Sequence, residues 1–335
     1  MKLILRFCII SIVLFSCNDD SGKSNCPPYD IVPESPYNDP VWHPSGNIIG
    51  FNHKPIKEIH YPNGYDCPRQ AVYEYDNDSA GFWLINSDGT NQRRILPYIL
   101  TTPAWSPDGK WIAFSKGAQI CIMSFDGTQF DTTTIVQLTT EGRNFLPAWS
   151  RNGDKIAFNE SICDKTIKCG IWIFGFEARA QTNINIYGNY PSWHPSSDSL
   201  IYVTNAINEK GTDVGDSIWI YINPLKVKHL LKYVALPNYD NRNLRYSPTG
   251  TIIAFISSLS TGGGMQLYTI NSDGSGLKQL TTDGCKNFSW SPEGKIVYLN
   301  FDNSRIDKTK GTLWIMNADG TNKRQLTYNN FQIIQ

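Results

Sequence analysis

Short apolar segments alternate with polar turns along most of the chain, and the turns recur with nearly the same residues. A typical unit begins with a segment that ends in an aromatic residue, followed by a Ser-Pro-Asp-Gly-type turn and a second apolar segment such as 111–114. A third segment, such as 312–316, leads to an Asp-Gly turn, and a last one ends in Leu-Thr. Asp and Gly tolerate positive φ, so these dipeptides are strong hairpin signals. Each unit is therefore predicted to form four antiparallel strands.

The aromatic residue before the first turn marks six copies of the unit. It occupies positions 42, 105, 149, 193, 246 and 290, which gives spacings of 63, 44, 44, 53 and 44 residues. Four antiparallel strands repeated every ~40–45 residues are typical of a propeller blade. One such sheet cannot bury both faces without neighbours. The predicted fold class is all-β, a six-bladed β-propeller of four-stranded antiparallel blades. The blades are expected at about 38–97, 98–140, 141–184, 185–236, 237–282 and 283–335.

The repeat also resembles a known family. Residues 103–114, PAWSPDGKWIAF, follow the signature of the TolB-like propeller repeats, P-x-W-S-P-D-G-K-x-I-A-F, a Pro-Asp-containing relative of the WD repeat. The resemblance extends over about residues 38–328. It implies the propeller fold, but it says little about function, because such repeats serve in many unrelated proteins.

The first 17 residues have the pattern of an export signal. Lys2 and Arg6 precede a short apolar stretch, and Leu14-Phe15-Ser16-Cys17 resembles the bacterial lipobox, in which the Cys is acylated. We therefore expect a lipoprotein signal peptide at 1–17, a tether at 18–37 and the propeller at 38–335. Asn18-Asp19-Asp20 resembles the surface-export tags of Bacteroidetes-type bacteria, although a solvated tether explains it equally well. The expected location is the bacterial outer membrane, facing the periplasm or the cell surface.

Composition and missing motifs favour a binding module over an enzyme. The formal net charge is zero, which gives no argument for nucleic acid as a partner. The sequence lacks the G-x-S-x-G, H-E-x-x-H, Walker-type and C-x-x-C motifs. The leading hypothesis is a scaffold that binds an envelope protein or glycan without a cofactor. The alternative is a metal-dependent carbohydrate lyase or hydrolase with a site in the central channel.

The candidate binding face is the one that carries the long loops. The first-to-second and third-to-fourth turns are short, whereas length variation concentrates on the opposite side, at 53–80, 161–168, 205–216, 257–264 and 302–310. Function often concentrates in variable loops on a rigid scaffold. Polar blade connections on this side should surround the channel mouth, and tyrosines of the first insert should form one wall. The predicted ligand-binding residues are Asn38, Asp39, Arg143, Asn144, Asn189, Arg242, Asn243, Lys286, Asn287, Tyr61, Tyr65, Tyr73 and Tyr75.

Cysteines and histidines give further expectations. Cys163 and Cys169 flank a short loop in blade three and are predicted to form a disulfide, with Cys26 and Cys67 as a second candidate pair. Cys121 occupies a packed aromatic slot and is expected to be a buried thiol.

Metal binding is not predicted. His43 and His194 replace Ser in the first turn of blades one and four, too far apart to share an ion, and turn variation accounts for them. His53, His60, Asp66 and Cys67 share the first insert and offer ligand atoms without a recognisable metal motif.

Overall fold

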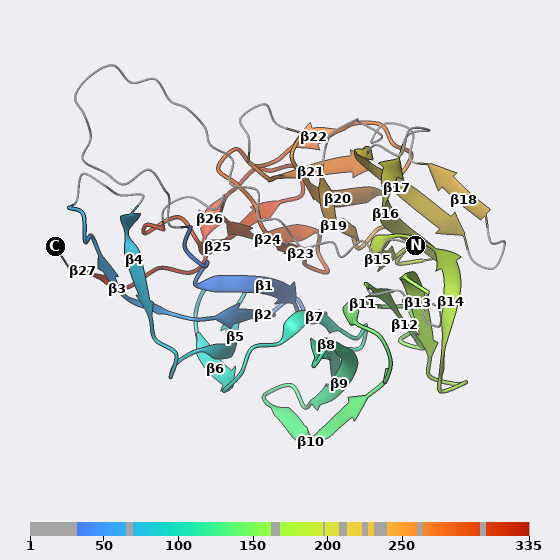
Figure 1. Cartoon of the computed structure of the whole chain (residues 1–335), viewed down its shortest axis with the longest axis horizontal. Helices are drawn as coiled ribbons and strands as arrows, with labels where there is room; N and C mark the ends of the chain where they lie inside the picture. Colours follow the sequence, from blue (N-terminus) through green and yellow to red (C-terminus); the bar gives the residue numbers. More distant parts are fainter. Residues whose placement is uncertain are drawn as a thin grey trace, which may run out of the picture.

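The protein is a six-bladed β-propeller, as the repeat predicts. The computed structural model describes residues 32–64, 70–161, 168–196, 198–207, 213–222, 227–230, 240–259, 264–301 and 306–334. Within them, six four-stranded antiparallel sheets follow one another around a ring, and the first strand of each lies nearest the centre of Figure 1. A seventh, three-stranded sheet shares no strand with these six.

Each blade uses four strands in chain order from the centre outward. Blades one to three are formed by β1 (Tyr37–Trp42), β2 (Ile48–His53), β5 (Gly81–Asn86) and β6 (Arg93–Leu96); β7 (Thr101–Trp105), β8 (Trp111–Lys116), β9 (Gln119–Phe125) and β10 (Phe130–Gln137); and β11 (Asn144–Trp149), β12 (Lys155–Glu160), β13 (Gly170–Gly175) and β14 (Ala180–Ile186). Blades four to six are formed by β15 (Asn189–Trp193), β16 (Ser199–Ile207), β17 (Asp213–Ile222) and β18 (Val227–Leu230); β19 (Asn241–Tyr246), β20 (Ile252–Ser257), β21 (Gln266–Asn271) and β22 (Lys278–Gln279); and β23 (Phe288–Trp290), β24 (Lys295–Asn300), β25 (Thr312–Asn317) and β26 (Arg324–Gln325).

A hydrophobic core fills each interface between neighbouring blades. Apolar side chains alternate along the strands, so both faces of a sheet are buried against its neighbours. Phe51 of blade one packs in the same core as Leu299 and Leu313 of blade six, and this core closes the ring. Among the described strands, blades one and six each keep their own four, so none of these strands is exchanged between the first and last blades.

The first turn of each blade is held by the residues that the motif repeats. In blade two, the Ser106 hydroxyl donates to Asp108 Oδ1 at 2.6 Å and accepts from the Trp111 amide at 3.0 Å. Gly109 takes a φ of 70°, a region that favours glycine. The hydrogen bond from Ser106 is the main reason why the pKa of Asp108 lies below its usual value. The Ser-Pro-Asp-Gly sequence thus provides its own turn contacts.

Three of the repeated aromatic residues, Trp149, Trp193 and Trp290, join neighbouring blades. The indole N–H of Trp149 donates to the Ala104 carbonyl at 3.0 Å, and that of Trp193 donates to the Ala148 carbonyl at 3.1 Å. Each bond therefore links an inner strand to the preceding one. Cys121 is a free, buried thiol, which confirms that prediction.

The first insert forms a small sheet with the last described strand. β3 (Ile56–His60) pairs antiparallel with β4 (Val72–Tyr75) and parallel with β27 (Gln332–Ile334). The range predicted for blade six, 283–335, included β27. The structure places this strand in the insert sheet and not in blade six. Figure 1 shows the insert sheet at the outer side of blade one. Within the described residues, no helix is long and apolar enough to cross a membrane.

Candidate functional site at the channel mouth

A repeated irregularity in the inner strands forms the mouth of the central channel. The pairing of the first two strands shifts register at the same place in blades one to five, for example between Asn38 and Val41 and between Arg242 and Arg245. The residue three positions before the repeated aromatic lies within each shift. These residues are Asp39, Thr102, Leu146, Tyr190 and Asn243, and Asn287 holds the corresponding position in blade six.

The five residues within the shifts adopt a left-handed backbone conformation. Their φ angles lie between 48° and 58°. Asp and Asn tolerate this region, but it is unfavourable for Leu146, Tyr190 and the β-branched Thr102. Strained backbone of this kind persists only where the surrounding structure enforces it, and it concentrates at functional sites. The strain therefore marks the mouth as a candidate site.

A cavity of about 260 Å³ opens between these residues. All six of them line it, together with Arg242, Lys286 and Arg245. Polar side chains join three of the blades across its floor. The Asn287 amide donates to Asp39 Oδ1 at 2.9 Å, and the Asn243 amide donates to Asn287 Oδ1. The cavity is therefore rimmed by groups that are already aligned for hydrogen bonding.

Asp39 is the carboxylate at this mouth. Asn52 donates to its Oδ2 at 3.0 Å and to the Leu100 carbonyl at 2.7 Å, which ties blade one to the connection that enters blade two. Burial raises the pKa of Asp39, and the hydrogen bond from Asn52, the Lys286 charge and the bond from Asn287 oppose that rise. The direction shows that removing the carboxylate from water outweighs the contacts around it.

Three cationic side chains line the same cavity as Asp39. Arg242 pairs with Asp240, with Nε donating to Oδ1 at 2.8 Å, and Lys286 Nζ lies 5.6 Å from the centre of the Phe301 ring. Arg245 lies deeper, because it lines both this cavity and a second one on the other side of the channel. Burial lowers the pKa of Arg245 to about 10, so its guanidinium stays charged at neutral pH. The mouth therefore presents positive charge with one central acid.

The second cavity, of about 320 Å³, is lined by the first-turn residues. His43 and His194 belong to these turns. His43 Nε2 contacts the Gly109 carbonyl of blade two at 3.0 Å, while its Nδ1 accepts from the Ser45 amide at 3.1 Å. His194 contacts Gly250 of blade five in the same way. Each histidine therefore connects its own blade to the next one. The interpretation as simple turn variation does not account for this contact.

Four other polar residues that were predicted at the mouth do not line its cavity: Asn38, Arg143, Asn144 and Asn189. Asn144 is buried and donates to the Glu141 carbonyl at 2.8 Å, and Asn38 donates to the Ser35 carbonyl at 3.0 Å. Arg143 is exposed and Asn189 is half-buried. The structure brings together Asp39, Arg242, Asn243, Lys286 and Asn287 from the predicted set. It adds Thr102, Leu146 and Tyr190, which the position three residues before each aromatic could have indicated, and Arg245, which directly precedes the aromatic Tyr246.

The described tyrosines of the first insert are buried or partly buried in a hydrophobic core instead of forming an exposed wall of the binding face. Tyr61 is buried at 7% exposure, and Tyr73 and Tyr75 pack against the same core between blades one and six. The Tyr73 hydroxyl accepts from the Ile306 amide at 3.3 Å, and the Tyr75 hydroxyl donates to the Glu34 carbonyl at 2.6 Å. Tyr65 lies outside the described residues. The described tyrosines therefore attach the insert to the ring.

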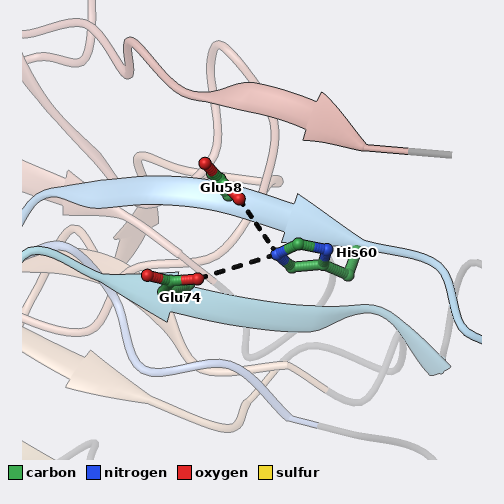
Figure 2. A group of neighbouring side chains, drawn as sticks. All are labelled: Glu58, His60 and Glu74. Carbon is green, nitrogen blue, oxygen red and sulfur yellow. Dashed lines mark ion pairs between the residues drawn. The ribbon is translucent and has the colours of Figure 1, made fainter.

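The insert sheet carries a group of side chains that could hold a metal ion. Figure 2 shows Glu58 and His60 on β3 and Glu74 on β4, with their functional groups turned toward one another. His53 is not part of this group, because its Nδ1 bonds the Pro36 carbonyl at 2.8 Å and its ring stacks on Tyr37. Asp66 and Cys67 lie outside the described residues. In the sequence, the signal for this group is that Glu58 and His60 are two positions apart, the spacing that places side chains on one face of a strand.

The cysteine pairs are only partly within the described residues. Cys169 is disulfide-bonded. Cys163, which was predicted as its partner, lies outside the described residues, as do Cys17, Cys26 and Cys67. The pairing of Cys163 with Cys169 and that of Cys26 with Cys67 remain predictions.

A wider groove of about 560 Å³ runs beside β14, between blades three and four. Lys155 lines this groove, and its Nζ lies 3.6 Å from Asp154 Oδ2 and 3.7 Å from Asp198 Oδ2. Lys155 is the one charged side chain among the described residues that line this groove, in contrast to the several charges at the channel mouth.

Comparison with known proteins supports the fold. No family model matches the chain, and no curated protein matches it. Among solved structures, TolB from Acinetobacter baumannii is similar with a TM-score of 0.57 and 21% identity, over 72% of this chain and 58% of that one. The chain thus spans less than two thirds of the length of that protein.

Two further structures resemble the chain at lower identity. An oligogalacturonate lyase in complex with manganese has a TM-score of 0.53 at 11% identity, over 87% of this chain and 78% of that one. The β-propeller domain of the Trilobed protease from Pyrococcus furiosus, described as having an open velcro topology, has a TM-score of 0.51 at 11% identity, over 88% and 98%. At these identities the likeness concerns the fold, and the chain is a β-propeller of TolB-like architecture.

Proposed function

We propose that the protein is a binding module whose ligand, the end of an envelope protein segment or of a glycan, enters the mouth of the central channel. The observation that carries this proposal is the ring of left-handed residues at one mouth. Five blades keep a left-handed backbone there, which is unfavourable for three of the five residues, and the side chains so presented surround a single cavity. Packing alone would not require three side chains as unsuited to this region as Thr102, Leu146 and Tyr190.

The size and chemistry of the cavity favour a chain end. Its volume of about 260 Å³ lies below the roughly 300–1,000 Å³ of sites that enclose a whole small molecule. Arg245 and Lys286 suit a carboxylate or a hydroxyl-rich group, because both donate hydrogen bonds and carry positive charge. Asp39 and the neighbouring amides can hydrogen-bond hydroxyl or N–H groups. The terminal residue of a peptide or a terminal sugar matches this combination.

The alternative of a metal-dependent lyase or hydrolase in the channel has weaker support. The fold of an oligogalacturonate lyase is similar, but fold alone does not carry an activity. Among the described residues that line the mouth, Asp39 is the one acidic side chain, and none is a histidine or cysteine. A catalytic zinc site needs about three protein ligands, so we favour binding over metal-dependent chemistry there.

The location of the module is proposed from the sequence. The lipobox-like segment ending in Cys17 supports acylation of that residue and attachment to the bacterial outer membrane. Labelling with a fatty-acid analogue should mark the wild-type protein and fail for Cys17→Ala. Labelling that persists in the variant contradicts the anchor without affecting the binding proposal.

A crosslinking experiment tests the binding proposal. A photoreactive aromatic amino acid replaces Tyr190 at the mouth in the full-length protein, which is then exposed to envelope extract and to an array of defined glycans. We expect crosslinked peptide or sugar at position 190, identified by mass spectrometry. We expect the yield to fall several-fold when Lys286→Ala or Arg245→Gln is added, because each removes a donor that faces the cavity.

A matched control places the same photoreactive residue at Asp273, in an Asp-Gly turn. Asp273 accepts from the Ser275 amide at 2.8 Å within that turn and does not line the mouth. Specific adducts from position 273 but not from position 190 place the ligand on the other face and overturn the proposal. Peptide adducts and sugar adducts distinguish the two ligand classes.

A further inference from the structure

We propose that Glu58, His60 and Glu74 form a binding site for a divalent transition-metal ion such as Zn²⁺. The site lies on the insert sheet, away from the channel mouth, and is independent of the proposed binding function. It combines one imidazole nitrogen with two carboxylates, a set of N and O ligands that zinc accepts.

Strand register brings the three side chains together. Glu58 on β3 is the direct partner of Glu74 on β4, and His60 lies two residues farther along the same face of β3. His60 Nε2 lies 3.2 Å from Glu58 Oε2 and 3.7 Å from Glu74 Oε2, as Figure 2 shows. Ligand atoms around a tetrahedral zinc ion are about 3.4 Å apart when its bonds measure about 2.0–2.1 Å. Small side-chain rotations are therefore enough to bring all three atoms to one ion.

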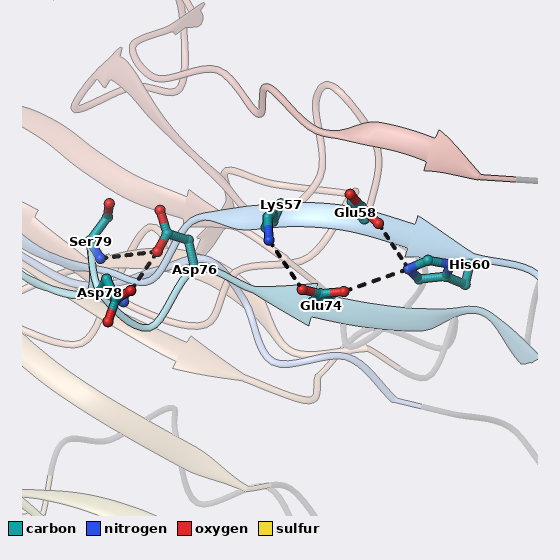
Figure 3. Close-up of polar contacts among 7 residues, drawn as sticks. All are labelled: Lys57, Glu58, His60, Glu74, Asp76, Asp78 and Ser79. Atoms are coloured by element: carbon teal, nitrogen blue, oxygen red, sulfur yellow. Dashed lines mark hydrogen bonds and ion pairs between the residues drawn. The ribbon is translucent and has the colours of Figure 1, made fainter.

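The charge arrangement favours a cation between the carboxylates. Two acidic side chains directly opposite each other on paired strands destabilise a sheet. Lys57 offsets part of this repulsion, because its Nζ lies 3.4 Å from Glu74 Oε1, as seen in Figure 3. That contact engages the oxygen of Glu74 that faces away from His60 and leaves Oε2 turned toward the imidazole. Contacts of this kind orient ligands in known metal sites.

Nearby acids do not extend the group. Asp76 Oδ1 accepts from the amides of Asp78 and Ser79 at 3.1 and 3.2 Å, so this carboxylate holds the turn after β4. Three protein ligands leave at least one coordination position for water. The side chains of His60, Glu58 and Glu74 are 38%, 29% and 51% exposed, so an ion reaches them from solvent.

A bound ion would stabilise the insert sheet, which contains β27, the last described strand. Gln332 and Ile334 of β27 pair with Glu58 and His60 of β3. The ligands come from both β3 and β4, so an ion binds them together only when those strands are paired. Metal binding therefore stabilises the insert sheet and its hold on β27.

Zn²⁺ titration of the purified full-length protein, freed of metal with a chelator, tests the site. We expect saturable uptake by calorimetry that depends on these three residues, together with slower amide hydrogen exchange in β3 and β4. His60→Gln and Glu74→Gln should each weaken the dissociation constant at least about tenfold, because each removes a ligand. Glu177→Gln, an exposed carboxylate on blade three, should leave the affinity unchanged.

Co²⁺ substitution separates this site from capture by cysteines. Binding at the proposed site gives the visible bands of a cobalt ion with nitrogen and oxygen ligands and no sulfur charge-transfer band. Both variants lie at exposed positions, and circular dichroism should show an unchanged fold. If Zn²⁺ uptake is absent, or is the same in wild type, His60→Gln and Glu74→Gln, the proposal is wrong.

Discussion

The side-chain amide of Asn287 donates a hydrogen bond of 2.9 Å to the carboxylate of Asp39, although the two residues are 248 positions apart in the chain. This bond joins the inner edge of the last blade to that of the first. The backbone amide of Trp42 adds a second link by donating to Ser289 Oγ at 3.0 Å. Side-chain contacts and the shared core hold the ring closed, and the pairing of β27 with β3 adds main-chain contacts between the last described strand and the insert of blade one.

Asn287→Ala should destabilise the fold through this contact. It leaves Asp39 Oδ1 without its donor inside the ring, which costs about 1–3 kcal/mol of unfolding free energy. Urea unfolding followed by tryptophan fluorescence measures the loss. A double-mutant cycle with Asp39→Ala should show coupling between the two sites. Additive effects of the two substitutions would mean that the bond does not contribute to stability.

Asp39 should also make stability depend on pH. Burial raises its pKa in the folded state, so the folded protein holds this proton more tightly than the unfolded chain does. The contribution of Asp39 therefore becomes less favourable as pH rises from about 4, its unfolded value, through the folded pKa. Stability of Asp39→Asn relative to wild type should increase over that interval in urea unfolding. A difference that is constant with pH contradicts the assignment.

His53 should act in the opposite pH direction. Burial lowers its pKa from 6.5 to about 4, while the bond to the Pro36 carbonyl opposes the shift. The unfolded chain takes up the proton first, so stability is lost as pH falls from about 6.5 toward 4. The shift corresponds to about 3 kcal/mol at full extent. Urea unfolding at about pH 7 and about pH 4.5 should show a loss roughly 2–3 kcal/mol smaller in His53→Phe, which keeps a ring against Tyr37. Equal losses would show that another group is responsible.

Leu146→Gly should destabilise the fold less than Leu146→Ala does. Leu146 has a φ of 58°, a conformation that costs residues with a Cβ about 1–2 kcal/mol. Both substitutions remove most of the side chain, but only glycine also removes the strain. Leu146→Gly should therefore be about 1 kcal/mol more stable than Leu146→Ala in chemical unfolding. At Thr182 in β14, whose backbone is ordinary, the order should reverse by about 0.5–1 kcal/mol.

Cys121 and Cys285 should not react in the folded protein. They are 2% and 0% exposed, and burial raises the pKa of both thiols, which suppresses the reactive thiolate. Alkylation with iodoacetamide followed by peptide mass spectrometry should find both unmodified under native conditions. Both should be modified in concentrated urea. Modification of either residue without unfolding would show that its core opens.

The sequence by itself determined the blade count and the strand order. Trp105 and its five counterparts recur at related spacings, and the turn that begins at Ser106 forms its contacts within residues 106–111. Such local chemistry can be read from neighbouring letters because the interacting atoms are close in the chain. The polar stretches that contain Asp39, Asn243 and Asn287 were found for the same reason.

Only the tertiary structure decided which of these residues meet. Asn144 and Arg242 both follow blade connections, yet the first is buried among backbone groups while the second reaches the channel mouth. In blades one to five, the bulge in the inner strand turns one residue per blade toward the channel, and Arg242 lies directly before that residue in blade five. Closure by Asp39 and Asn287 and the pairing of β27 with β3 both join segments that are distant in the chain. These contacts depend on how six separately encoded sheets pack around one axis, and that packing is a property of the whole ring.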